Sequence, residues 1–319
     1  MSVVDETPAT TAGSANGGAP GAVPDPDPAD LEAALREWGR HADATPAFVD
    51  ALVEVAETAS ELATRDHVRI AHLLHHNLRA EATTDSLPED RLATTRAPDL
   101  AVAPAPGPRT PLPAPPDDEE TERHLELVRR RRSTPLFGER AMSAAELSGV
   151  LAGALQAKGL APAYHRRDIP RRVFPSAGGL QPVDAYVLAH RVDDVAPGVY
   201  RYDPLAHELV LQEAGDPRTR VLDATIFTEW LFDAAAVVVL SADLDRVTWK
   251  YGSRAYRYLL MDTGVVCGQL YLAATAMDLS VNAVAAFRDD ALNAMLHLDG
   301  VTRFANLLVG LGPQPQRPG

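Results

Sequence analysis

The sequence predicts an α+β fold, and two observations lead to this class. First, helical and strand-like segments are mixed without the regular strand–helix–strand repeat of a parallel sheet. Second, the short run of small and β-branched residues from Ala234 to Ser241 is typical of a central strand that is covered on both faces. The chain has 319 residues, of which 46% are hydrophobic, so it can bury a sizeable core.

The first part of the chain predicts three segments that precede the main domain. Residues 1–29 hold almost no large apolar side chains and predict a disordered tail. Residues 30–82 carry apolar residues at helical spacing and predict a small helical module. Residues 83–118 are rich in proline and predict a stiff, extended linker. We therefore expect the main domain to cover residues 119–319.

Four histidines lie in the predicted helical module, at His67, His72, His75 and His76. His72 and His76 suggest a pair of metal ligands, but the glutamate that a zinc-protease helix requires is missing and no acidic third ligand is evident nearby. A solvated or interface face is the simpler interpretation, and we expect no metal site.

Helical signals open the main domain. Residues 119–132 place Leu125 and Val128 on an inward stripe and predict a helix. Ser143 and Glu146 form a capping box, which predicts the start of a second helix. Gly159 is the expected stop signal of that helix.

Strand signals follow these helices. Alternating residues predict a strand over 185–192, and the turn-forming pair Asp203-Pro204 predicts a hairpin between 199–202 and 208–212. After the central strand come an apolar helix over 259–277, strands over 281–287 and 306–311, and, between those strands, a helix to Leu296 with Asp289 or Asp290 as its cap.

The composition argues against several classes of function. A net charge of −14 argues against nucleic-acid binding through phosphate neutralisation. The longest apolar stretch is too short to cross a bilayer and the N-terminus lacks the regions of a signal peptide, so we expect no membrane partner and a cytoplasmic location. The single cysteine, Cys267, excludes an intrachain disulfide and a multi-cysteine metal site.

The triplet Arg131, Arg132 and Ser133 follows a basic run at the end of the first helix of the main domain. A guanidinium group matches phosphate oxygens and the serine adds a hydroxyl donor, so the triplet suits the phosphate and ribityl tail of a flavin. Solvated surface arginines are the commoner explanation of such a run. By itself the triplet therefore does not decide between these interpretations.

A loop of small residues precedes the strand predicted at 185–192. It comprises Pro175, Ser176, Ala177, Gly178 and Gly179. Small residues let backbone N–H groups approach a planar ligand closely, and such donors stabilise charge on a reduced flavin. An ordinary turn is the alternative, while a P-loop is disfavoured because neither its lysine nor a following helix is present.

Lys250 and Tyr251 lie side by side at the mouth of the apolar helix, with Gly252 next to them. Both side chains normally titrate well above neutral pH, so a site that lowers either pKa gains a proton-transfer group. The alternative is an amphipathic, solvent-facing turn at the start of a helix. On the pair alone, that alternative is the stronger interpretation.

The order and spacing of these segments resemble the nitroreductase-like flavoproteins and, more narrowly, the SagB-type dehydrogenases that oxidise thiazolines and oxazolines. The resemblance covers residues 129–313. Besides the segments above, it includes 198–202, 251–258, Gly264, 269–274, 286–290 and 309–312. It implies a nitroreductase-like fold, in which helices flank a central, mainly antiparallel sheet, a bound FMN, and a homodimer with each flavin at the subunit interface. The implied flavin contacts are the triplet, the loop, Gln269, Ala286, Phe287, Gly310 and Gly312.

Within that family the Lys250–Tyr251 pair matches the lysine–tyrosine pair associated with azoline oxidation. The resemblance implies an FMN-dependent azoline dehydrogenase that acts on a ribosomally synthesised peptide after a cyclodehydratase, with the flavin N5 accepting hydride and oxygen reoxidising the flavin. Lys250 is the expected base and Tyr251 its partner, because burial favours the neutral form of a lysine, although the two roles are exchangeable. The alternatives are an NAD(P)H-dependent nitro or quinone reductase and a non-catalytic structural subunit of a synthetase complex.

Overall fold

The computed structural model describes residues 107–226 and 228–316. It also describes the separate residues Ala33, Arg36, Arg40, Pro46, Asp50, Val53 and His75. The chain divides into two compact units, Met1–Glu57 and Thr58–Gly319, and the second unit contains the fold described below. The predicted tail, and most of the predicted helical module and linker, lie outside the described residues.

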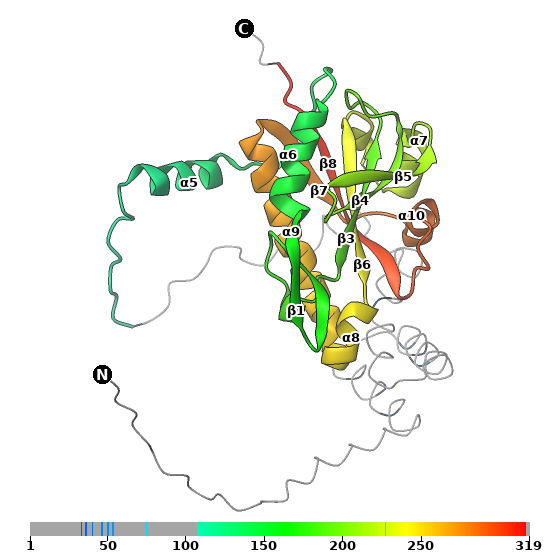
Figure 1. The fold of residues 1–319 in the computed structure, drawn as a ribbon, viewed down its shortest axis with the longest axis horizontal. Coiled ribbons are helices and arrows are strands. Elements are labelled where there is room, and N and C mark those ends of the chain that lie inside the picture. The colour runs from blue at the N-terminus through cyan, green and yellow to red at the C-terminus, as the bar shows by residue number, and fades with distance from the viewer. Residues whose placement is uncertain are drawn as a thin grey trace, which may run out of the picture. The chain divides into compact units, whose positions relative to one another are not determined.

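The second unit is built on a six-stranded sheet in the order β5-β4-β3-β6-β8-β7 (Figure 1). All neighbouring strands pair antiparallel. The strands are β3 (Val183–Ala189), β4 (Gly198–Asp203), β5 (Glu208–Ala214), β6 (Ala236–Asp243), β7 (Leu279–Val284) and β8 (Arg303–Pro313). With its flanking helices, this sheet confirms the predicted α+β class.

Strand β6 is the central strand that the sequence predicts. It lies between β3 and β8, with Val238 opposite Val187 on one side and Val309 on the other. Every residue of β3 and nearly every residue of β6 is buried, which is why both read as unbroken apolar runs. The predicted hairpin is also confirmed, since β4 pairs with β5 around the turn at Asp203.

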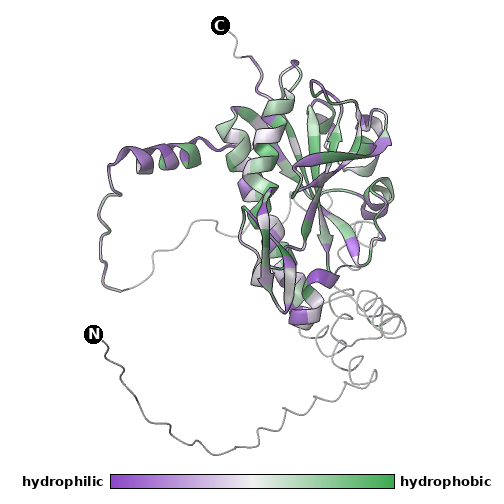
Figure 2. Cartoon of the chain, in the orientation of Figure 1, coloured by the Kyte–Doolittle hydropathy of each residue, from purple (hydrophilic) through white to green (hydrophobic). Residues whose placement is uncertain are grey.

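Helices cover both faces of the sheet, as Figure 1 shows. On one face α6 (Ala144–Leu155) and α9 (Ala255–Ala276) pack against side chains such as Val187 and Val238. On the other, α7 (Arg218–Ala224) and α10 (Asp289–Met295) pack against side chains such as Leu188 and Val239. Apolar residues therefore gather on the strands and on the helix faces that meet them (Figure 2).

Helix α6 begins at the capping box predicted from the sequence. The backbone N–H of Glu146 donates to the Ser143 hydroxyl (3.1 Å), and the Glu146 carboxylate accepts from the Ser143 N–H (2.7 Å). Hydrogen bonds from Arg140 lower the pKa of Glu146 to about 2. The expected stop at Gly159 is wrong, because the helix ends at Leu155 and Gly159 lies in the next strand.

A second, two-stranded sheet was not predicted. Strand β1 (Ala157–Ala163) pairs antiparallel with β2 (Arg166–Arg172), and Tyr164 and His165 form the turn between them. Both turn residues have positive φ, at 53° and 61°, as a two-residue type I′ hairpin turn requires. Tyr-His lacks the asparagine or glycine that usually marks such a turn, so the sequence pattern does not reveal it.

The chain enters α9 through two short helical segments. These are α8 (Asp245–Tyr251) and the 3-10 turn Gly252–Arg254, where Gly252 has a φ of 55°. Helix α9 therefore starts at Ala255, four residues before the predicted start at 259. The predicted cap of α10 is wrong, because Asp289 is the first residue inside that helix and the N-cap is Arg288, which forms no side-chain cap.

Within the described residues, one helical stretch, Asp245–Ala276, is long and apolar enough to span a membrane by length and composition. It includes α9, and 44% of its most apolar window is buried inside the protein. Helix α9 packs against α6 and the sheet in the larger core cluster, which accounts for its apolar character.

Candidate functional site

The Pro175–Gly179 loop is fixed to helix α9 by one buried carboxylate. The Ser176 hydroxyl donates to Asp262 Oδ2 (2.5 Å), and the Ala177 N–H donates to Asp262 Oδ1 (3.1 Å). Burial raises the pKa of Asp262 above its ordinary value, although these two donors oppose the shift. The sequence analysis missed Asp262, and the available signal was a single acidic residue within an otherwise apolar helix.

Gly178 is the point where the loop meets the predicted catalytic pair. It is exposed and has a φ of 60°, which favours glycine. A Cβ at this position would lie 2.5 Å from the Tyr251 hydroxyl oxygen, 2.7 Å from Lys250 Nζ and 2.9 Å from the Tyr164 hydroxyl oxygen. Three polar side-chain ends thus converge on a backbone that has no room for a side chain.

Tyr164 connects these groups through hydrogen bonds. Its hydroxyl donates to the Gly178 carbonyl oxygen (2.6 Å) and accepts from Lys250 Nζ. Lys250 Nζ also lies 4.2 Å from the centre of the Tyr164 ring and 4.9 Å from that of Tyr251. Trp249 packs edge to face on Tyr164, with ring centres 5.4 Å apart. Tyr164, which the sequence analysis missed, therefore belongs to the same cluster as Lys250 and Tyr251.

The environment of Lys250 differs from the buried one that we expected. Its side chain is exposed, and hydrogen bonding to Tyr164, followed by Tyr251, raises its pKa above the ordinary lysine value. Lys250 therefore carries its proton at neutral pH in the uncovered chain, that is, the chain without a peptide bound over Lys250. The expectation that burial makes it a neutral base is wrong for this state of the protein.

The arginine–serine triplet lies beside Tyr271 on helix α9. The Ser133 hydroxyl donates to the Tyr271 hydroxyl (3.2 Å), which also accepts from the Ala283 N–H (2.9 Å). The Arg131 guanidinium lies over the Tyr271 ring, 5.6 Å from its centre. Helix α5 (Glu119–Arg130) ends immediately before the triplet and confirms the helix predicted over 119–132. The inward stripe expected on this helix is wrong, because none of its residues is buried and Val128 is 45% exposed.

The basic run divides into paired and unpaired arginines. Arg129 forms an ion pair with Glu122 (2.8 Å) and Arg130 forms one with Asp278, whereas no carboxylate among the described residues pairs with Arg131 or Arg132. Arg132 Nη1 donates to the backbone carbonyl oxygens of Arg129 and Arg131. Guanidinium groups without an ion pair next to the Ser133 hydroxyl fit the phosphate of FMN. The donor set of the triplet is thus compatible with the predicted cofactor.

Two backbone donors of the loop, those of Ala177 and Gly179, are used inside the protein. The N–H of Ala177 donates to Asp262, that of Gly179 donates to the Ser176 carbonyl oxygen (2.9 Å), and that of Gln181 donates to the Ser176 hydroxyl (2.9 Å). These donors are satisfied inside the protein. The open side of the loop is at Gly179, where an added Cβ would meet no atom within 4 Å.

Three of the other predicted flavin contacts lie among packed side chains. Gly310 and Gly312 lie on β8, where an added Cβ would lie 3.0 Å from Trp230 and from Phe137, respectively. Phe287 is buried in the core cluster on the α7 and α10 face of the sheet. Their contact with the cofactor stays a prediction.

Gln269 and Ala286 are less buried than Gly310 and Gly312. Gln269 is half-buried on α9, two residues before Tyr271, whereas Ala286 is exposed and its carbonyl oxygen accepts from the Ile226 N–H (3.0 Å). Along α9, Tyr271 is nine residues from Asp262, which corresponds to about 14 Å at 1.5 Å per residue. The triplet and the loop therefore contact α9 at two different positions along its axis.

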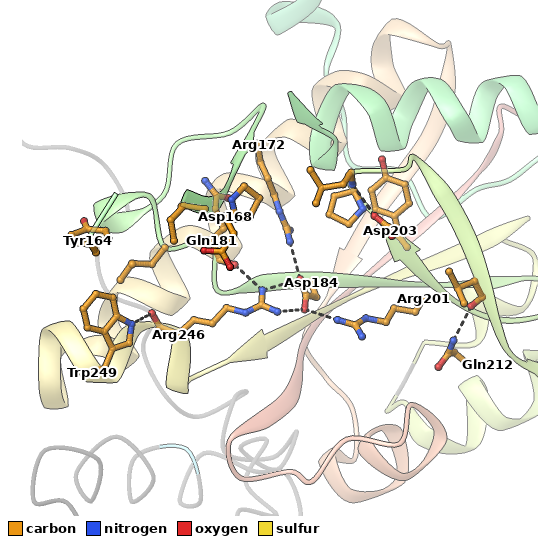
Figure 3. A pocket seen from close by; sticks show the side chains of 17 residues that line it. Tyr164, Asp168, Arg172, Gln181, Asp184, Arg201, Asp203, Gln212, Arg246 and Trp249 are labelled. Carbon is orange, nitrogen blue, oxygen red and sulfur yellow. Dashed lines mark hydrogen bonds and ion pairs between the residues drawn. The ribbon is translucent and has the colours of Figure 1, made fainter. Parts of the chain in front are cut away.

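A second polar cluster, also missed from the sequence, surrounds Asp184 on β3. Its carboxylate pairs with Arg172 (2.8 Å), Arg246 (2.7 Å) and Arg201 (3.3 Å), as Figure 3 shows. Burial raises the pKa of Asp184, but Arg246 and Arg172 outweigh this effect and hold it well below the ordinary value. Asp184 is therefore ionised throughout the physiological pH range.

The antiparallel sheet, with α6 and α9 on one face and the loop held against α9, defines a nitroreductase-like fold. Residues 128–312, more than half of the chain, match the model of the nitroreductase family. The protein therefore belongs to the nitroreductase family.

Two curated sequences illustrate this relationship. A Methanocaldococcus jannaschii protein assigned as a nitroreductase is 32% identical over 127 residues, which cover 40% of this chain and 64% of that protein. The trifolitoxin operon protein TfxC of Rhizobium leguminosarum bv. trifolii is 30% identical over 180 residues, which cover 53% of this chain and 50% of that protein. The chain thus matches 64% and 50% of the lengths of these relatives.

Solved structures share the fold at lower identity. The structure of an Anabaena variabilis protein assigned as a nitroreductase has a TM-score of 0.51 at 24% identity and covers 78% of this chain and 48% of that one. A chain of the E. coli microcin synthetase McbBCD complex, with truncated pro-MccB17 bound, has a TM-score of 0.58 at 19% identity. That match covers 81% of this chain and 97% of the other. At these identities the likeness establishes the fold alone.

Proposed function

We propose that this protein is an FMN-dependent azoline dehydrogenase of the SagB type, which oxidises thiazoline or oxazoline rings in a ribosomally synthesised peptide. The observation that carries the proposal is the convergence of Lys250, Tyr251 and Tyr164 on Gly178. Reduction of a nitro group or a quinone does not require a base, whereas aromatisation of an azoline ring requires one for the ring proton. A cluster of proton-handling groups on an exposed glycine backbone meets that requirement.

The names of two similar proteins support a peptide substrate. TfxC is named for the trifolitoxin operon, and the microcin synthetase structure contains truncated pro-MccB17. Because peptide-modifying synthetases are assemblies, we include a cyclodehydratase among the proposed partners and place the protein downstream of it, in the cytoplasm. The protein then receives rings that are already closed.

FMN, when bound, would supply the acceptor for the hydride, which carries both electrons that leave the ring. Arg131, Arg132 and Ser133 would hold its phosphate through charge-assisted hydrogen bonds. The chain's own contribution to the chemistry is the removal and storage of the ring proton, which we assign to Lys250 and Tyr251. Tyr164 positions Lys250 through the hydrogen bond to its Nζ.

The raised pKa of Lys250 restricts how it acts. In the uncovered chain the ammonium group donates to Tyr164 and cannot accept a proton. A peptide that covers Lys250 removes water from the ammonium group and lowers its pKa, since burial disfavours the charged form. Lys250 thus becomes a base on substrate binding, or else it remains charged and Tyr251 accepts the proton beside it.

Substitution of the pair tests the function and separates these two roles. Lys250→Ala abolishes the loss of two hydrogen atoms per ring, measured by mass spectrometry of an azoline peptide, while flavin absorbance is retained. Lys250→Arg keeps a positive charge but cannot act as a base near neutral pH. An inactive Lys250→Arg variant identifies Lys250 as the base, an active one assigns the base to Tyr251, and full turnover by Lys250→Ala contradicts the proposal.

The exposed position of Lys250 favours one alternative, an NAD(P)H-dependent nitro or quinone reductase, because such an enzyme needs no buried base. This alternative predicts that NADPH-driven reduction of a nitroaromatic compound proceeds equally well in the wild type and in Lys250→Ala. The other alternative, a non-catalytic subunit, predicts purified protein without flavin absorbance even after incubation with FMN.

The proposed cofactor site has its own test. Arg132→Ala removes an unpaired guanidinium group and is expected to weaken FMN binding by about tenfold or more, the range for one charge-assisted hydrogen bond. Arg129→Ala is the matched control, because Arg129 is already paired with Glu122. Equal FMN dissociation constants for the two variants, measured by fluorescence quenching, would place the phosphate elsewhere.

A homodimer is part of the proposal. Leu260, Met261 and Val265 leave an apolar stripe on α9 that is 41%, 59% and 37% exposed. The stripe lies beside Asp262, the residue of α9 that holds the loop, so a second copy packed on it would cover the loop side of the cofactor site. Met261→Asp is expected to yield monomers in light scattering and to weaken FMN binding, whereas a monomeric wild type contradicts the shared site.

A further inference from the structure

A cavity of about 860 Å³ lies between the β1–β2 hairpin, the β4–β5 hairpin and helix α8 (Figure 3). Its volume falls within the range of sites that hold small ligands or short peptide segments. One end of the cavity is formed by Tyr164 and Trp249. Because the Tyr164 hydroxyl also accepts from Lys250, the cavity adjoins the proposed proton-handling cluster.

Arg201 is the most accessible of the three arginines in the wall of the cavity. All three, Arg172, Arg201 and Arg246, pair with Asp184, and Arg246 also pairs with Asp243 (3.0 Å). Asp168 and Asp203 line the cavity as well, so the charged side chains of its lining are three arginines and three aspartates. The longest contact with Asp184 is that of Arg201 (3.3 Å), whose side chain is 44% exposed. The guanidinium of Arg201 is therefore the one that a ligand in the cavity can reach.

The cavity also contains a buried polar group without a partner. Gln181 is 4% exposed, lines the cavity and has a φ of 54°, and its Oε1 makes no hydrogen bond within the described part of the chain. Apolar side chains surround these polar groups, among them Ile169, Leu180 and Val210. The cavity thus combines one accessible positive charge, an unsatisfied amide and an apolar wall.

We propose that this cavity binds a carboxylate-bearing segment of the peptide substrate, with the carboxylate on Arg201 and neighbouring residues along the apolar wall. The inference rests on the proposed function, since it takes the substrate to be a peptide. One carboxylate matches the one accessible guanidinium, that of Arg201. A phosphate dianion matches less well, because Asp168 and Asp203 also line the cavity and repel a second negative charge.

Binding of short peptides to the full chain loaded with FMN tests the inference without any turnover. The probes are dye-labelled leucine- and alanine-containing hexapeptides with a free C-terminal carboxylate, with a C-terminal amide, or with an amide and an internal glutamate. The wild type is expected to bind at least one carboxylate peptide about tenfold more tightly than the uncharged amide, as one charge-assisted hydrogen bond provides. Tighter binding of the peptide with the free C-terminus identifies a terminal carboxylate, whereas tighter binding of the peptide with the internal glutamate identifies a side-chain carboxylate.

Arg201→Gln is expected to abolish this preference. Arg220→Gln is the matched control, because Arg220 is equally exposed but pairs with Glu213 outside the cavity and leaves the preference unchanged. Equal binding of charged and uncharged peptides, an unchanged preference in Arg201→Gln, or displacement of the peptides by NADP⁺ would overturn the inference. Azoline oxidation without a carboxylate preference refutes this inference alone, whereas a carboxylate preference without azoline oxidation refutes only the proposed reaction.

Discussion

The Tyr164 hydroxyl donates a hydrogen bond to the carbonyl oxygen of Gly178 across 2.6 Å and thereby joins the β1–β2 hairpin to the loop that precedes β3. The same hydroxyl accepts from Lys250, so one side chain connects three segments that are distant in the sequence. The position of Lys250 thus depends on a hairpin that is not part of the main sheet.

Tyr164→Phe is expected to lower the pKa of Lys250, because the hydrogen bond from Lys250 to Tyr164 is the largest cause of its upward shift. The rate of Lys250 acetylation as a function of pH measures this change, with the midpoint moving to lower pH in the variant. Tyr258→Phe is the control, since the Tyr258 ring contacts Tyr251 at 4.6 Å without a hydrogen bond to Lys250. Equal midpoints in Tyr164→Phe and the wild type would show that Tyr164 does not position Lys250.

Gly178→Ala is expected to abolish turnover, because the new Cβ would lie 2.5 Å from the Tyr251 hydroxyl oxygen and 2.7 Å from Lys250 Nζ. Gly179→Ala separates this contact from backbone strain. Both glycines have positive φ, at 60° and 69°, so both substitutions cost about 1 kcal/mol of stability, but only Gly178 has neighbours within 4 Å. Thermal unfolding and turnover of the two variants provide the comparison, and equal activities would argue against a cluster centred on Gly178.

Asp262→Asn is expected to change how stability depends on pH. The folded pKa of Asp262 is raised above its ordinary value of 3.8, so the folded chain holds more protons than the unfolded chain in that interval. The free energy of unfolding of the wild type therefore falls as pH rises from 3.8 through the folded pKa. The asparagine variant lacks this fall, and it also loses about 1–3 kcal/mol because an NH₂ group replaces one of the two accepting oxygens.

Urea unfolding at several mildly acidic pH values measures both effects. Asp278→Asn is the control, because Asp278 is exposed and pairs only with Arg130 among the described residues. If the difference in unfolding free energy between the wild type and Asp262→Asn is the same at every pH, the buried carboxylate does not titrate as described.

Asp184→Asn is expected to destabilise the protein by about 3–5 kcal/mol, since it leaves the guanidinium of Arg172 buried without its counter-charge. Asp216→Asn breaks a comparable pair with Arg218, but both side chains are more than a third exposed, so a loss below about 1 kcal/mol is expected. Similar losses for both variants in denaturant unfolding would contradict a buried network around Asp184.

Local signals were sufficient for the parts of the fold that sequence analysis predicted. The Ser143–Glu146 capping box and the Asp203 turn act over a few residues, and the buried run that became β6 is explained by its own composition. The β1–β2 hairpin was missed because Tyr164 and His165 adopt positive φ without the residues that normally favour it.

The candidate site was only partly predictable for a different reason. The sequence indicated Lys250, Tyr251 and the loop separately, but their meeting at Gly178 spans segments more than seventy residues apart. Tyr164 is 86 residues from Lys250, and no local pattern predicts such a contact. Gly310 and Gly312 have a packing role that the sequence did not indicate, because an added Cβ at these positions would meet the rings of Trp230 and Phe137.

The separate pairing of β1 with β2 also matters for protein engineering. Neither strand pairs with the six-stranded sheet, yet the turn between them carries Tyr164 and the second strand supplies Arg172 to the cavity. A graft of residues 157–172 between related scaffolds therefore leaves the strand pairing of the main sheet in place, provided that it keeps Arg172, which pairs with Asp184 on β3. Exchange of the other residues of this hairpin would vary the wall of the cavity on an unchanged main sheet.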